Sequence, residues 1–274
     1  MKLTVLVTTM NQTDFSLVEK MNIQSDAVIG NQADRFEIQE EIVNGHRIRM
    51  VTTPFRGTSR NRNTALEFAD ESDIIMFMDD DFQFTDGYEA QVIQEFERHP
   101  EAEFIKFNIY DLPGHRFTNP PAKIFSRATR AGSKSFNGVW GGAIRTSARI
   151  RENLFFDEGF GPGMEKDFGE DTIYIQGLFS KGLKVYKSPL YIANMLPSES
   201  TWNNAFDEHR FYCMGSVLKK CYPKWWHLLA CRAALRLSKR DDVDFSAGQI
   251  LQLIFEIEKR RSSKPASSTK RQSR

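Results

Sequence analysis

The sequence predicts an α/β protein with a Rossmann-like, mostly parallel sheet and a helical appendage at its C-terminus. Short β-branched runs alternate with amphipathic segments through the first hundred residues, as they do in βαβ units. Residues 74–78 are apolar throughout, which is typical of a strand buried on both faces of a parallel sheet. Asp79, Asp80 and Asp81 follow this run directly. Open α/β sheets bind ligands outside the carboxyl ends of their strands, so we expect the functional site at this junction.

The remaining elements follow from hydrophobic periodicity and from breaker residues. In the first half, strands are expected at residues 3–9, 26–30 and 48–51, and a helix over residues 59–69 leads into the strand at 74–78. In the second half, strands are expected at 104–109 and 122–125, a tight loop at 138–142 and a helix over 172–183. After Pro189 the chain becomes rich in aromatic residues and is expected to be helical.

Length and composition are those of a globular protein with a full-sized core. The 274 residues fit an α/β domain over residues 1–200, a helical region over 201–258 and a disordered tail over 259–274. The tail is basic, because it holds seven Lys or Arg residues and no acid. The formal net charge of +1 gives no sign of nucleic-acid binding.

Cysteine usage and the start of the chain favour the cytoplasm. Cys213, Cys221 and Cys231 are an odd set without a Cys-x-x-Cys pair, so they suit neither a disulfide framework nor a zinc site. The chain enters a strand at once, and no apolar stretch approaches the length of a transmembrane helix. We therefore expect a cytoplasmic protein, either soluble or peripheral on the inner face of the membrane.

The aspartate cluster has the composition of a cation site. Side chains alternate along an extended chain, so Asp79 and Asp81 are expected on one face, with Asp80 pointing away. Two such carboxylates are able to hold a hard divalent cation. The alternative is a solvated acidic turn. No Gly-x-Gly-x-x-Gly follows the first strand and no Walker sequence occurs anywhere, which disfavours dinucleotide and P-loop folds.

Four further clusters carry polar or aromatic side chains near expected strand and helix ends. Arg62 and Asn63 lie in the first turns of a helix, where they would face a phosphate or ribose, or simply form a polar helix start. Asn31 and Gln32 end the second strand, where a base could be hydrogen-bonded. The third cluster is Trp140-Gly141-Gly142, which could form either a sugar pocket or a plain turn. The fourth is Gly169-Glu170-Asp171-Thr172, whose acids could either act in catalysis or simply stabilise the N-terminus of a helix.

The order of these motifs resembles the family 2 glycosyltransferases with the GT-A fold, over roughly residues 1–225. The shared order is a Thr8-Thr9-Met10-Asn11 loop, Ser59-Arg60-Asn61-Arg62-Asn63, the Asp-x-Asp strand end, Trp-Gly-Gly, Phe156-Asp157-Glu158-Gly159-Phe160 and Gly-Glu-Asp-Thr. The chain departs from the family in two places. Its second strand ends in Asn31-Gln32 rather than in an Asp-Asp-Gly-Ser-like turn. A histidine usual after the last strand is replaced within residues 191–194, which leaves its phosphate contact missing or supplied by His209.

The resemblance implies an inverting, metal-assisted transfer of a sugar from a nucleoside-diphosphate sugar, with UDP as the expected nucleotide, in polysaccharide biosynthesis. Asp79 and Asp81 would hold Mn²⁺ or Mg²⁺, and Asp171 would be the catalytic base, oriented by Glu170. The implied donor-binding residues are Thr8, Thr9, Asn11, Asn31, Gln32, Arg62, Asn63, Asp79 and Asp80. Trp140, Gly141 and Gly142 would shape a sugar pocket for a glycan or lipid-linked glycan acceptor.

A mixture of basic and apolar residues over 219–239 fits either a helix at an anionic membrane surface or a helix packed on the catalytic domain.

Three other functions compete with this interpretation. A haloacid-dehalogenase-type phosphatase would use Asp79 as its nucleophile, but it needs Thr or Val where this chain has Gln83. A sugar-phosphate nucleotidyltransferase needs a Gly-rich, Arg-containing loop after the first strand, which is absent here. A glycosyltransferase-like binding subunit without activity is disfavoured because Asp79, Asp81 and Asp171 occur together.

Overall fold

The computed structural model describes residues 1–69, 71–112, 120–130, 136, 138–197 and 206–262. They belong to two compact units, Met1–Thr201 and Trp202–Arg274. Most of the expected basic tail, residues 263–274, lies outside the described residues.

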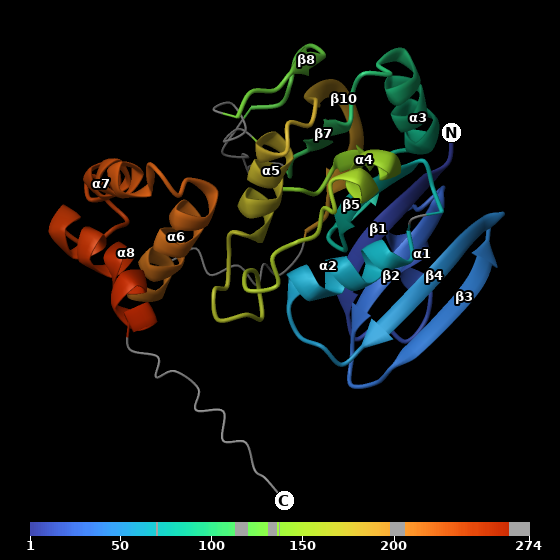
Figure 1. The fold of residues 1–274 in the computed structure, drawn as a ribbon. Helices are drawn as coiled ribbons and strands as arrows, with labels where there is room; N and C mark the ends of the chain where they lie inside the picture. The colour runs from blue at the N-terminus through green and yellow to red at the C-terminus, as the bar shows by residue number, and fades with distance from the viewer. Residues whose placement is uncertain (70, 113–119, 131–135, 137, 198–205, 263–274) are drawn as a thin grey trace, which may run out of the picture. The chain divides into compact units, whose positions relative to one another are not determined.

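The first unit is built on one mixed sheet (Figure 1) with the strand order β3-β4-β2-β1-β5-β9-β7-β10-β6, and β8 pairs with β10. The strands that run in one direction are β1 (Leu3–Met10), β2 (Asp26–Gln32), β4 (His46–Thr53), β5 (Ile74–Asp79), β7 (Phe104–Tyr110) and β10 (Val185–Met195). The antiparallel strands are β3 (Glu37–Val43), β6 (Phe82–Phe84), β8 (Ser126–Arg127) and β9 (Gly142–Arg145).

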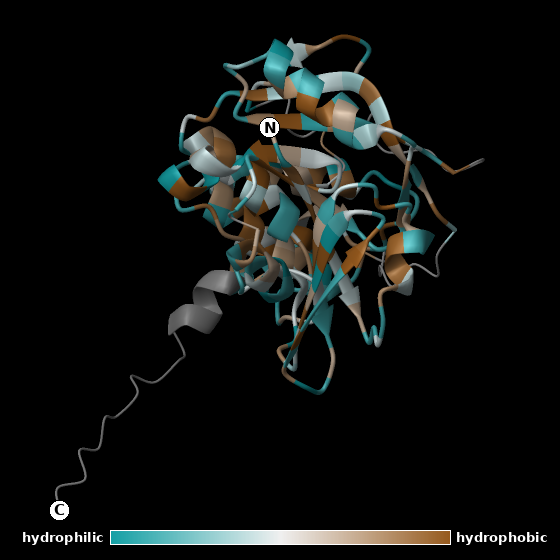
Figure 2. Cartoon of the chain, turned by 90° about the vertical axis from the view of Figure 1, so that its right-hand side faces the viewer, coloured by the Kyte–Doolittle hydropathy of each residue, from teal (hydrophilic) through white to brown (hydrophobic). Residues whose placement is uncertain are grey.

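The sheet is covered on both faces, because its central strands contribute buried apolar residues to two separate cores. Figure 2 shows hydrophobic residues, in brown, along these strands. One core packs against α1 (Ser16–Lys20) and α3 (Tyr88–Arg98). The other packs against α2 (Thr58–Glu67), α4 (Thr146–Arg151) and α5 (Glu170–Ser180). Alternation in β1 supplies both cores, since Val5 and Val7 face the first and Leu6 faces the second.

Most predicted elements are confirmed, but one predicted strand is absent, the predicted helical region begins later than expected, and the edge strand β3 was missed. The strand β3 was not predicted, because Glu37, Glu40 and Glu41 break the apolar pattern of an edge strand that is only half buried. Residues 122–125 form no strand; Ala122 is held instead by hydrogen bonds with the side chain of Asn108. The segment directly after Pro189 is not helical, because β10 continues to Met195 with register shifts beside this proline. The helices expected there begin only at Glu208.

The second unit contains three helices in its described part, α6 (Glu208–Cys221), α7 (Trp226–Leu237) and α8 (Ala247–Ser262). Its centre is formed by Phe211, Trp226, Ile250 and Ile254, all buried. Helices α6 and α8 approach closely at Gly215, where a Cβ atom would lie 2.3 Å from the carbonyl oxygen of Ile254. Over the described part of the chain, every helix is too short or too polar to span a lipid bilayer.

Candidate active site

The carboxyl ends of the parallel strands bring the predicted site residues to one edge of the sheet. In the register of β1 with β5, Thr8 lies opposite Asp79, and in that of β1 with β2, Thr9 lies opposite Asn31. The Thr8 hydroxyl donates to Asp79 Oδ1 over 3.0 Å, and the Thr9 hydroxyl donates to Asp80 Oδ2 over 2.5 Å. The threonines at the end of β1 therefore orient the first two carboxylates of the cluster.

The expected alternation of the three aspartates does not apply. Strand β5 ends at Asp79, and Asp80 and Asp81 form a turn. Lys20 Nζ donates to the Asp80 carbonyl, and the Leu196 amide donates to the Asp81 carbonyl. Backbone contacts thus shape the turn, and a shared face for Asp79 and Asp81 cannot be argued from strand periodicity.

Arg62 on α2 is the central cation of the site. Its side chain is only 4% exposed, yet it donates to Asp79 Oδ1 over 2.8 Å and to Asp171 Oδ1 over 2.6 Å. Its guanidinium also lies 3.8 Å from Glu170 Oε1 and 5.1 Å from the centre of the Phe156 ring. Burial alone would lower the pKa of Arg62, but the three carboxylates outweigh it and raise that pKa above its ordinary value. Arg62 is therefore charged, and it joins the predicted metal ligand to the predicted base.

Asp171 and Glu170 open α5 but lie in different environments. Asp171 accepts the Arg62 hydrogen bond on Oδ1 and the Val139 amide on Oδ2, and its side chain is 15% exposed. Glu170 is 2% exposed, and burial together with the nearby Asp171 charge raises its pKa to about 8. Burial and the Asp171 charge thus both favour the protonated form of Glu170. Gly161, with φ of +107°, lies against its carboxyl group, where a Cβ atom would come within 3.2 Å.

The Trp-Gly-Gly loop lies against Asp171. Any side chain at Gly138 would displace Trp140, because its Cβ would lie 2.3 Å from the indole Nε1 and 3.0 Å from Asp171 Oδ2. The Gly141 amide donates to the Phe77 carbonyl on β5, and its own carbonyl accepts from Phe107 on β7. The loop is thereby fixed between these two strands.

Lys106 on β7 is a site residue that the sequence analysis missed. It is buried beneath Trp140, donates to the Trp140 carbonyl and places its Nζ 4.0 Å from the centre of an indole ring. Burial lowers the pKa of Lys106 to about 7, although the charges of Asp171 and Asp79 oppose the shift. A charged residue within the apolar run 104–109 was the available signal.

Several predicted donor-binding residues have structural hydrogen bonds. Asn31 is fully buried, and its side chain bonds the backbone of Gln12 and the Thr52 hydroxyl. Gln32 accepts the Gly57 amide that precedes α2, and Asn63 bonds Phe156 and Glu158. Asn31, Gln32 and Asn63 therefore hold the loops of this edge in place, and whether they also contact a donor stays a prediction.

Asn11 directly follows β1 and lies in the left-handed backbone region, at φ of 57°, which asparagine tolerates better than most residues. Its amide donates to the Gln32 carbonyl. Its contact with a donor stays a prediction too.

The carboxylates of this edge fit a hard divalent cation. Asp79 receives its hydrogen bonds on Oδ1, and among the described residues no hydrogen bond reaches its Oδ2. Asp81 adds a second carboxylate two residues away. An all-oxygen set of this kind suits Mg²⁺ or Mn²⁺.

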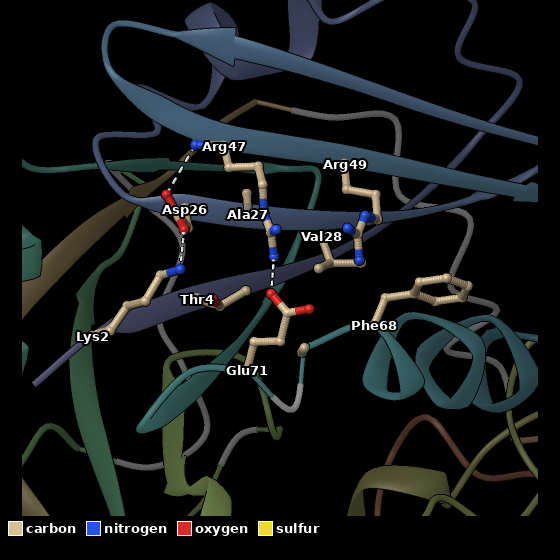
Figure 3. A pocket seen from close by; sticks show the side chains of 10 residues that line it. Lys2, Thr4, Asp26, Ala27, Val28, Arg47, Arg49, Phe68 and Glu71 are labelled. Carbon is tan, nitrogen blue, oxygen red and sulfur yellow. Dashed lines mark hydrogen bonds and ion pairs between the residues drawn. The ribbon is translucent and has the colours of Figure 1, made fainter.

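The opposite, amino edge of the sheet has a small pocket of another character (Figure 3). Lys2 pairs with Asp26 at 2.8 Å, and Arg47 pairs with Glu71, so the charged side chains that line it are largely matched with one another. It lies away from the strand ends that ligands favour in open α/β sheets, and we assign these contacts to stability.

Comparisons with known proteins agree with this geometry. Residues 30–156 match the model of the family described as Glycosyl transferase family 2. No curated protein sequence matches the chain. Among solved structures, the chain resembles S. aureus TarS 1–349 in complex with UDP-GlcNAc, with a TM-score of 0.60 and 15% identity over 96% of this chain and 73% of that one. S. aureus TarS in a longer form matches with a TM-score of 0.58 and 14% identity, over 96% of this chain and 44% of that one.

The fold is thus the GT-A fold, and the protein is a glycosyltransferase. The segment that matches the family model, residues 30–156, includes Arg62, the three aspartates and the Trp140 loop.

Proposed function

We propose that the protein is an inverting, metal-assisted glycosyltransferase that moves a sugar from a UDP-sugar to a hydroxyl group of a glycan, in polysaccharide biosynthesis. The observation that carries the proposal is the Arg62 cluster, in which one buried cation joins Asp79 at the metal-type strand end to Asp171 at the helix start. The UDP-GlcNAc bound in one of the similar structures supports this donor class.

Asp79 and Asp81 would hold Mn²⁺ or Mg²⁺ at the carboxyl end of β5. When bound, the cation would screen the negative charge that grows on the diphosphate leaving group. Thr8 fixes the orientation of the Asp79 carboxylate through its hydrogen bond. Arg62 adds a fixed positive charge at the same place, and such preorganised charges lower the barrier without reorganisation during the reaction.

Asp171 is the base in this proposal because Glu170 is too buried to act. Asp171 would take the proton of the acceptor hydroxyl while the acceptor oxygen bonds the anomeric carbon. The bond from this carbon to the diphosphate breaks at the same time, and its electron pair leaves with the nucleotide. One displacement of this kind inverts the anomeric configuration. Asp171 is also the direct partner of Arg62 on α5, at 2.6 Å, whereas Glu170 lies 3.8 Å from the guanidinium.

Hydrolysis of the donor tests the proposal without knowledge of the acceptor. Purified protein is incubated with a panel of UDP-, GDP-, dTDP- and CMP-sugars with and without Mn²⁺, and early products are followed by NMR. We expect Mn²⁺-dependent release of UDP, with a first-formed sugar of inverted configuration. The Asp171→Asn variant should lose this activity, whereas Glu97→Gln, the same chemical change on the exposed side of α3, should retain it. Retained configuration, or turnover unaffected by a chelator, would contradict the proposal.

We also propose that the enzyme works as a peripheral protein at the inner face of a membrane, on a glycan or lipid-linked glycan acceptor. The mixture of basic and apolar residues over 219–239 supports this location.

A further inference from the structure

Helix α7 has two opposite faces of different character. The buried face consists of Trp226, Ala230, Ala234 and Leu237, and Trp226 packs edge-on against Phe255 of α8. The opposite face consists of Leu228, Arg232 and Leu235, and Trp225, which directly precedes the helix, continues it. Spacings of three, four and three residues place the four on one stripe. Trp225, Leu228 and Leu235 are 66%, 64% and 60% exposed. We call this stripe the Trp225 face.

The charge around the Trp225 face is positive. Helix α7 contains Arg232 and Arg236 and no acidic residue, and Lys224 and Lys239 flank its two ends. All four of these side chains are exposed. Large apolar side chains with cations beside them are the pattern of a helix that lies in a membrane interface, where Trp sits at the headgroup level and basic residues meet anionic lipid.

We infer that the Trp225 face binds the surface of an anionic lipid bilayer. This inference deepens the proposed peripheral location by naming the surface that makes the contact, and it does not depend on the proposed sugar transfer. A second copy of the chain fits the face less well, because two-fold pairing would bring Arg232 and Arg236 of both copies together.

Vesicle co-sedimentation with the full chain tests the inference. Vesicles contain either phosphatidylcholine alone or phosphatidylcholine with 30% phosphatidylglycerol. The charge variant Arg232→Gln/Arg236→Gln should bind the anionic vesicles roughly 25-fold more weakly, since each basic residue near the surface contributes about fivefold. The apolar variant Leu228→Ser/Leu235→Ser should bind them at least tenfold more weakly. The control Lys181→Gln/Lys184→Gln removes the same charge from exposed positions of the first unit and should bind as wild type does.

The results separate the inference from the proposed function. All three variants should keep wild-type hydrolysis of UDP-sugars, because none touches the Arg62 cluster. The inference is supported if wild-type protein binds anionic vesicles, if salt releases it from them, and if both α7 variants bind them more weakly. It is overturned if wild-type protein stays in the supernatant at low salt, or if both α7 variants bind as wild type does. A wild-type dimer that Leu228→Ser/Leu235→Ser converts to monomer, without vesicle binding, would instead assign the face to a second copy.

Discussion

Replacing Arg62 by methionine tests whether the site depends on one buried cation. The substitution keeps a long side chain but removes the charge and the hydrogen bonds to Asp79 and Asp171, of 2.8 and 2.6 Å. Removing one partner of a buried ion pair typically costs 3–5 kcal/mol, because the other charge stays behind unpaired. The two aspartates are 26% and 15% exposed, so water screens part of the repulsion. We therefore expect Arg62→Met to lower the free energy of unfolding by about 3 kcal/mol.

Thermal unfolding measures this loss directly. For a protein of this size, about 3 kcal/mol corresponds to a fall in Tm of roughly 6–12 °C. Arg60→Met is the matched control, since it is the same change two residues away on α2. Arg60 pairs with Glu158 at 3.2 Å, with both side chains more than a third exposed, so its loss should cost less than about 1 kcal/mol.

Mn²⁺ and acid pH should both reduce the deficit of the Arg62→Met variant. The cation would replace the lost positive charge beside Asp79, and protons would neutralise the carboxylates. Equal Tm values for the Arg62 and Arg60 variants would refute the reasoning. So would a deficit in Arg62→Met that responds to neither Mn²⁺ nor pH.

Three further substitutions separate metal binding, catalysis and stability. Asp81→Ala should abolish the Mn²⁺-dependent affinity for UDP in calorimetric titration, and unchanged affinity would remove Asp81 from the metal site. Asp171→Asn should lower kcat about a hundredfold or more while UDP still binds, because the amide cannot accept the proton; wild-type turnover would place the base elsewhere. Asn63→Ala should lower the free energy of unfolding by about 2–3 kcal/mol, because buried backbone groups of Phe156 lose their partners. Urea unfolding checks this, with Thr64→Ala as the control on the same helix.

The sheet was predictable wherever local sequence carries its signal. β1, β5 and β7 are short apolar runs, and burial on both faces demands such runs. β3 has no such signal, since an edge strand with one solvated face accepts glutamates. The continuation of β10 past Pro189 depends on a bulge against β7, and only the neighbouring strand reveals it.

The candidate site was predictable residue by residue but not in its connections. Asp79, Asp171 and Arg62 each follow from motif position. The contact between Arg62 and Asp171 joins residues 109 positions apart, and it arises from the packing of α2 and α5 on one face of the sheet. Lys106 was missed because its partner is a backbone carbonyl in the Trp140 loop, and backbone positions leave no trace in sequence.

The two buried titratable groups beside Asp171 should give stability slopes of opposite sign. Glu170 has a native pKa of about 8 against an ordinary 4.5, so between these values the native state holds a proton that the unfolded chain has released. Wild-type stability therefore falls as pH rises through this window. Glu170→Gln removes this titration. The gain in its free energy of unfolding over wild type should therefore be absent below pH 4.5 and complete above pH 8. A difference of about 3.5 pH units corresponds to at most about 5 kcal/mol.

Lys106 should behave in the reverse way. Its native pKa of about 7 lies below the ordinary 10.5, so in that window the unfolded chain holds a proton that the native state lacks, and wild-type stability rises with pH. The gain of Lys106→Met over wild type should be largest below pH 7 and should vanish above pH 10.5. Urea unfolding of both variants at pH 5, 7 and 9 measures the two slopes. Between pH 7 and 9 the stability advantage of Glu170→Gln over wild type should rise or stay constant, whereas that of Lys106→Met should decline. Burial penalises the charged form of each group, and Glu170 is charged above its pKa whereas Lys106 is charged below its own. Slopes of the same sign would mean that one of these side chains reaches water in solution.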